Sequence, residues 1–125
     1  MKKTKKSKIQ HIYDPIFKQN YYFIDCKNHD EFLKICLDEL EIDIGKEKRL
    51  VDGECYEIIR EDIPIQVFWT NKKHIEVVVH ECFHAVYSCL SNRGIELSTS
   101  SEEIFAYLLQ YLIEEIKSGK SWRGQ

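Results

Sequence analysis

The stretch "VVVHECFHAV" (residues 77–86) has the apolar content of a buried helix, yet it holds two histidines and a glutamate within five positions. Its apolar residues and those on either side recur at the spacing of one helical face, which predicts a helix over residues 74–92. Gly94 stands where such a helix would end. His80 and His84 fall outside the apolar arc, one turn apart, so their rings are expected to point the same way.

The run His80-Glu81-Cys82-Phe83-His84 is an H-E-x-x-H motif, whose spacing suits a zinc ion. Two imidazoles one helical turn apart can both reach one Zn²⁺ at about 2.0–2.1 Å. Glu81 would miss the metal but reach a water bound to it, and zinc lowers the pKa of that water so that the carboxylate can take its proton. We interpret His80 and His84 as metal ligands and Glu81 as a general base. The alternative is an ordinary polar stripe on a surface helix.

A catalytic zinc site takes three protein ligands and leaves one position open, so a third ligand is expected. Glu102 and Glu103 lie at the start of a second predicted helix over residues 101–117. Two antiparallel helices joined by a turn can bring either glutamate close to the histidines. Both glutamates also fit a capping box, Thr99 with Glu102 or Ser100 with Glu103, and only one box can form. The residues alone leave the choice between the two glutamates open.

These motifs resemble the gluzincin group of zinc metallopeptidases, in which H-E-x-x-H is followed after about twenty residues by a glutamate in an E-x-x-A setting. The matching glutamate here is Glu103, within the sequence EIFA at 103–106. The stretch at 75–116 is also similar to short metallopeptidase-like proteins encoded by phages and prophages. The first half of the chain resembles these proteins only in being rich in strands.

The resemblance implies a zinc-dependent metallopeptidase that acts on a peptide or protein substrate. His80, His84 and Glu103 would bind the Zn²⁺, and Glu81 would be the general base. Larger gluzincins bring a Tyr or His from a later segment to stabilise the oxyanion, and Tyr107 is the candidate for that role or for supporting the zinc site. The plainer interpretation of Tyr107 is a partly buried helix tyrosine.

A second hypothesis is a non-catalytic binding module, of phage or mobile-element origin, that keeps a zinc site for folding or partner recognition. The small size of the chain and the lack of any histidine after Glu103 favour it. A third possibility is a metal-free protein.

The order of predicted elements indicates an α+β fold with a small, mainly antiparallel sheet packed on helices, a minimal zincin-like domain. The elements are a strand at 20–26, a helix from 28 to about 45, strands at 55–60 and 63–70, and helices at 74–92 and 101–117. In gluzincins a strand near the motif helix often holds an extended peptide, and the segment 63–70 is the candidate here. We expect a single domain over residues 9–119, a flexible basic tail at 1–8 and a C-terminal tail at 120–125.

With 125 residues, of which 43% are apolar and 31% charged, the chain has the composition of one globular domain. No apolar run approaches the length of a membrane span and none follows the basic start "MKKTKKSKIQ", so we expect a cytoplasmic protein. Five of the 18 basic residues lie among the first eight, which leaves 13 positive against 21 negative charges, a net −8, in the remainder. Such a body is a poor partner for duplex DNA, although the tail could touch nucleic acid. The oligomeric state cannot be predicted.

The five cysteines are an odd number with no C-x-x-C pair, which argues against a disulfide framework and a four-thiolate zinc site. Cys82 and Cys89 are seven residues apart on the predicted helix and share a face. We expect all five to be small buried hydrophobic residues. His11 and His29, in predicted loops, and His74, at a helix start, are not expected to bind the metal.

Overall fold

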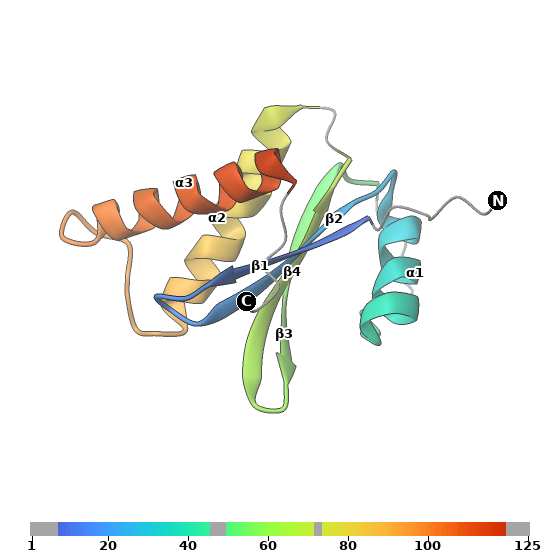
Figure 1. The fold of residues 1–125 in the computed structure, drawn as a ribbon, viewed down its shortest axis with the longest axis horizontal. Helices are drawn as coiled ribbons and strands as arrows, with labels where there is room; N and C mark the ends of the chain where they lie inside the picture. The colour runs from blue at the N-terminus through green and yellow to red at the C-terminus, as the bar shows by residue number, and fades with distance from the viewer. Residues whose placement is uncertain (1–7, 46–49, 72–73, 120–125) are drawn as a thin grey trace.

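A computed structural model describes residues 8–45, 50–71 and 74–119, and these form an α+β fold, as predicted (Figure 1). Its elements are β1 (Ile9–Asp14), β2 (Gln19–Asp25), α1 (His29–Leu40), β3 (Gly53–Arg60), β4 (Ile63–Thr70), α2 (Ile75–Ser91) and α3 (Glu102–Ser118). Apart from Lys8, the two predicted tails lie outside the described residues.

The four strands form one mixed sheet in the order β1-β2-β4-β3. The pairs β1–β2 and β3–β4 are antiparallel, whereas β2 and β4 run parallel, with Tyr21 opposite Gln66 and Asp25 opposite Thr70. Two of the three pairings are therefore antiparallel, as expected of a mainly antiparallel sheet, but the central pairing is parallel. The strand β1 was not among the predicted elements.

The helices cover both faces of this sheet, with α1 on one side and α2 and α3 on the other (Figure 1). Phe23 and Phe68 pack in a core with the inner faces of α2 and α3. Val67 and Trp69 point to the opposite face and pack with Phe32 of α1. Because β4 contributes buried side chains to both cores, α2 is fixed to a sheet that is packed on both sides.

The helix that carries the motif has the predicted limits, with His74 as N-cap and Asn92 as C-cap. Just beyond its C-terminal end, the Arg93 guanidinium donates hydrogen bonds to the carbonyl oxygen of Phe17, at 3.0 Å from Nε and 2.6 Å from Nη2. It also donates to the carbonyl of Cys89 at 2.7 Å. Arg93 thus ties this end of α2 to the turn between β1 and β2.

Two other helix ends differ from the sequence interpretation. The helix α1 starts close to the predicted residue, where the Asn28 side chain caps it by accepting a hydrogen bond from the Glu31 backbone at 2.9 Å, but it ends at Leu40 and not near residue 45. Glu41 follows it in the left-handed region with φ of 56°. At α3 the N-cap is Ser101, which makes no side-chain capping bond, so neither predicted capping box begins this helix.

All five cysteines are free thiols, four of them buried and Cys55 partly buried. Burial raises the pKa of Cys36 and, together with the charge of Glu81, that of Cys82 to about 12. These thiols have the environment of small hydrophobic residues, as predicted. None of the helices in the described ranges has the length and apolar content needed to cross a membrane.

Candidate metal centre and catalytic site

His80 and His84 lie on the exposed face of α2 and their rings meet, with centroids 4.7 Å apart. Their Nε2 atoms are separated by 3.1 Å. Two nitrogen ligands of one tetrahedral zinc, each at about 2.0–2.1 Å, would lie about 3.3 Å apart. The pair therefore fits two positions of a zinc site, although one imidazole donating to the other at this distance would look the same.

Glu81 turns away from solvent and is only 6% exposed. None of the other described residues donates a hydrogen bond to its carboxylate or pairs with it. Burial raises the pKa of Glu81, the charge of His80 opposes this effect, and the charge of Glu54 adds to it. Burial thus favours the neutral, protonated form of the Glu81 carboxyl group.

Glu81 can occupy this position because β3 begins with a glycine. Gly53 faces α2, and a β-carbon there would lie 3.0 Å from Glu81 Cγ, 3.2 Å from Val77 Cγ1 and 2.8 Å from the Trp69 carbonyl oxygen. The missing side chain lets the edge strand approach the motif helix closely.

An open pocket of about 380 Å³ lies between the start of β3 and the N-terminal half of α2. It reaches one of the two histidines and the glutamate of the motif. Its lining consists of Asp52, Gly53, Glu76, Val77, His80 and Glu81. A molecule in this pocket would therefore lie beside His80 and Glu81.

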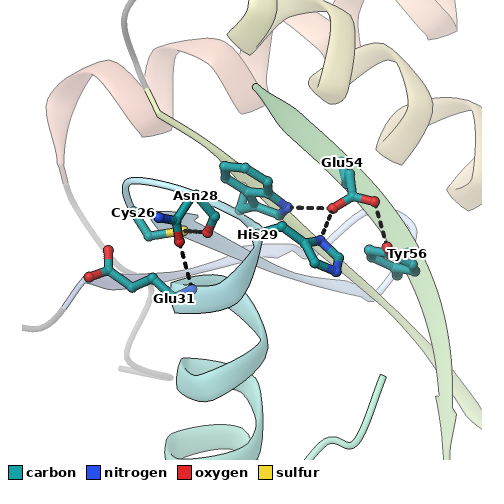
Figure 2. Close-up of polar contacts among 7 residues, drawn as sticks. Cys26, Asn28, His29, Glu31, Glu54 and Tyr56 are labelled. Atoms are coloured by element: carbon teal, nitrogen blue, oxygen red, sulfur yellow. Dashed lines mark hydrogen bonds and ion pairs between the residues drawn. The ribbon is translucent and has the colours of Figure 1, made fainter. Parts of the chain in front are cut away.

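A buried polar cluster supports β3 from the α1 side (Figure 2). The Glu54 carboxylate pairs with Nδ1 of His29, accepts a hydrogen bond from the Tyr56 hydroxyl at 2.6 Å, and accepts another from Trp69 Nε1 at 3.1 Å. Burial raises the pKa of Glu54, but these hydrogen bonds outweigh that effect and hold the pKa below its ordinary value. No spacing rule predicts this cluster, because its members come from α1, β3 and β4.

Glu102, Glu103 and Tyr107 are all exposed on α3, and Tyr107 is 63% exposed, so it is not the partly buried residue of the plainer interpretation. Across residues 8–45, 50–71 and 74–119, no group of three or more His, Cys, Asp or Glu side chains is placed to hold a metal ion. The structure thus brings His80 and His84 together without Glu103. The role of Glu103 as third ligand remains a prediction.

The other histidines lie in ordinary structural settings. His11 belongs to β1, where it stacks on Tyr22 at 4.7 Å, and His29 is the first residue of α1, so neither lies in the predicted loop. His74 is the N-cap of α2.

The segment 63–70 cannot hold an extended peptide along its length, because β4 is a central strand. Over Gln66–Thr70 it pairs with β2 on one side and with β3 on the other. The strand with an edge free of other described strands, next to α2, is β3. The expectation for 63–70 is therefore wrong, and β3 takes its place as the candidate.

No protein-family model, curated protein or solved structure matches this chain.

Proposed function

We propose that the protein is a zinc-dependent hydrolase of peptide bonds. The observation that carries the proposal is the 3.1 Å separation of the His80 and His84 Nε2 atoms, next to a glutamate that is 6% exposed. Adjacent residues of one helix thus offer two metal-ligand nitrogens to solvent and one carboxylate to a pocket. This combination of an exposed ligand pair and a sheltered base is what hydrolysis by activated water requires.

Each group has a defined part in this proposal. His80 and His84 hold the zinc, and Glu103 is the proposed third ligand. When bound, zinc supplies a Lewis acid that polarises a carbonyl group and acidifies water. Glu81 accepts the proton of the attacking water and returns it to the departing amine, and Tyr107 is the proposed donor to the oxyanion.

The substrate would bind as an extended peptide along the outer edge of β3. Among the described strands, β3 has a neighbour only on the side of β4, and its first residue, Gly53, lies against Glu81. Backbone hydrogen bonds to such an edge give affinity without fixing the sequence of the peptide. A peptide that follows β3 toward Gly53 would bring an amide bond to Glu81.

One observation favours the second hypothesis, a zinc-stabilised binding module without catalysis. Glu103 and Tyr107 are exposed, and among the described residues no third side chain joins the histidine pair. A site completed by a partner molecule would leave the pair in this state. This hypothesis predicts that removal of zinc unfolds the protein and that no peptide is cut.

The deciding experiment is metal analysis of untagged protein, followed by a peptide-library digest. The proposal expects one zinc per chain, loss of that zinc in His84→Ala, and cleavage that stops when a chelator is added. Stoichiometric zinc with an uncut library would favour the binding module. A protein that contains no metal and takes up none would overturn both hypotheses.

A further inference from the structure

The pocket between β3 and α2 has several acidic side chains in its lining. Three of its six lining residues, Asp52, Glu76 and Glu81, are carboxylates, and no lysine or arginine of the described residues lines it. The remaining lining residues are His80, Gly53 and Val77. Its volume of about 380 Å³ falls at the lower end of the range for small-ligand sites.

Two features show that the pocket is more than a chance gathering of acids on the surface. Glu81 lines it while 6% exposed and without a hydrogen-bond or ion-pair partner among the described residues. Asp52 is held in place, since its Oδ1 accepts a hydrogen bond from Asn71 Nδ2 at 2.9 Å and its carbonyl accepts one from the Asn71 amide at 3.1 Å. Within the described part of the chain, the one polar contact of the Glu76 side chain is a long one, 3.9 Å from Oε1 to Nδ1 of exposed His74. Within the described residues, the Glu76 carboxylate therefore keeps most of its hydrogen-bond acceptor sites for a ligand.

The lining selects the kind of cation. Its three carboxylates come from two parts of the chain, with Asp52 just before β3 and Glu76 and Glu81 on α2. An ammonium or guanidinium group carries three or five N–H donors and no acceptor, and it can reach several carboxylates at once. An organic cation of this kind therefore matches the acceptors of the lining.

We propose that this pocket binds an ammonium or guanidinium group of the peptide substrate, and that Asp52 and Glu76 determine this specificity. The inference rests on the proposed function, because it places the cation next to the bond that Glu81 would help to cut. Either a lysine or arginine side chain or a free amino terminus supplies the same chemistry.

The test measures binding separately from cleavage. Alanine-based peptides with an acetylated amino terminus carry one lysine, arginine, norleucine or glutamate at each position in turn, and one further alanine peptide has a free amino terminus. Their Kd is measured by fluorescence anisotropy, and mass spectrometry checks that each peptide stays intact. We expect the best lysine or arginine peptide, or the free-terminus peptide, to bind about tenfold more tightly than its neutral counterpart, a difference of about 1.4 kcal/mol. The ratio of the two Kd values should become smaller as salt is added, because salt screens the attraction between the charges.

The variant Asp52→Asn/Glu76→Gln should lose this preference and bind the norleucine peptides as before. The matched control Asp38→Asn/Glu39→Gln removes the same charge from exposed positions on α1 and should keep the preference. Equal binding of charged and neutral peptides by the unmodified protein would overturn the inference, and so would a preference that survives in the pocket variant. Cleavage without a charge preference would contradict only the proposal that the pocket binds a cationic group. A charge preference without any cleavage would contradict only the proposal that the protein is a hydrolase.

Discussion

Gly53 and Glu81 meet where the edge strand crosses the motif helix, and a β-carbon on Gly53 would lie 3.0 Å from Cγ of Glu81. The same β-carbon would lie 2.8 Å from the backbone oxygen of Trp69, which cannot move aside as a flexible side chain can. The contact therefore links the geometry of the sheet edge to the position of the proposed base.

Gly53→Ala tests this contact. We expect it to lower the free energy of unfolding by roughly 1–3 kcal/mol, because the strand must shift away from α2 to make room. It should also reduce hydrolysis, since the added methyl group would press against Cγ of Glu81 and displace its side chain. Urea denaturation gives the stability change, and Ile59→Ala, at an exposed position on the same strand, is the control. Unchanged stability would show that the strand and helix tolerate the extra atom.

Glu81→Gln separates metal binding from catalysis. The amide has nearly the same shape but cannot accept a proton, so we expect zinc content to be unchanged and hydrolysis to fall by about 10²–10⁴-fold. Metal analysis and a peptide-cleavage assay on the same sample measure the two effects. Glu114→Gln, at an exposed position on α3, controls for loss of one charge. Full activity in Glu81→Gln would rule out its role as base.

Glu103→Ala and Glu102→Ala distinguish the two candidate third ligands. Loss of a group that only supports a metal ligand weakens metal affinity by roughly 10–100-fold. If Glu103 itself binds zinc, Glu103→Ala should weaken zinc affinity by more than this, and Glu102→Ala should bind zinc normally. Competition with a chelating dye measures both affinities. Equal and normal zinc binding in the two variants would exclude both glutamates as the third ligand.

Glu54→Gln should make stability less dependent on pH. The pKa of Glu54 is lower in the folded protein than its ordinary value of 4.5. The ionised carboxylate therefore stabilises the fold at pH values above 4.5, and this contribution is lost as the pH falls through the lowered pKa. We expect Glu54→Gln to cost roughly 1–3 kcal/mol at pH 7 and much less at pH 3. Thermal unfolding across this pH range, with Glu39→Gln as control, provides the measurement. An equal loss at both pH values would mean that the charge of Glu54 contributes nothing.

Elements with strong apolar periodicity could be predicted from the sequence, and those that depend on distant partners could not. The limits of α2 follow from its repeating apolar residues, and the closeness of His80 and His84 follows from helix geometry alone. The strand β1 was missed because Gln10 and Asp14 are two of its three buried residues, so it lacks an apolar alternation. The position of Glu103 depends on the path of the chain between α2 and α3, which no local rule specifies.

The buried cluster around Glu54 shows the same limit. His29 is 25 positions away from Glu54 in sequence, and Trp69 is 15 positions away on the other side. Tyr56 lies two residues from Glu54 on the same strand, and Trp69 is its cross-strand neighbour in the β3–β4 hairpin, so these two donors depend on the strand register. The third donor, His29, is brought to Glu54 by the packing of α1 against the sheet.

The parallel pairing of β2 with β4 has a consequence for how the chain reaches this structure. The two hairpins join residues close in sequence, whereas the seam between them joins Tyr21 to Gln66 and Asp25 to Thr70. Closing so long a loop is entropically costly, and non-local pairing of this kind slows folding. We expect each hairpin to form early and the pairing of β2 with β4 to form in the rate-limiting step. The pocket between β3 and α2 should therefore form only after the two halves of the sheet have paired.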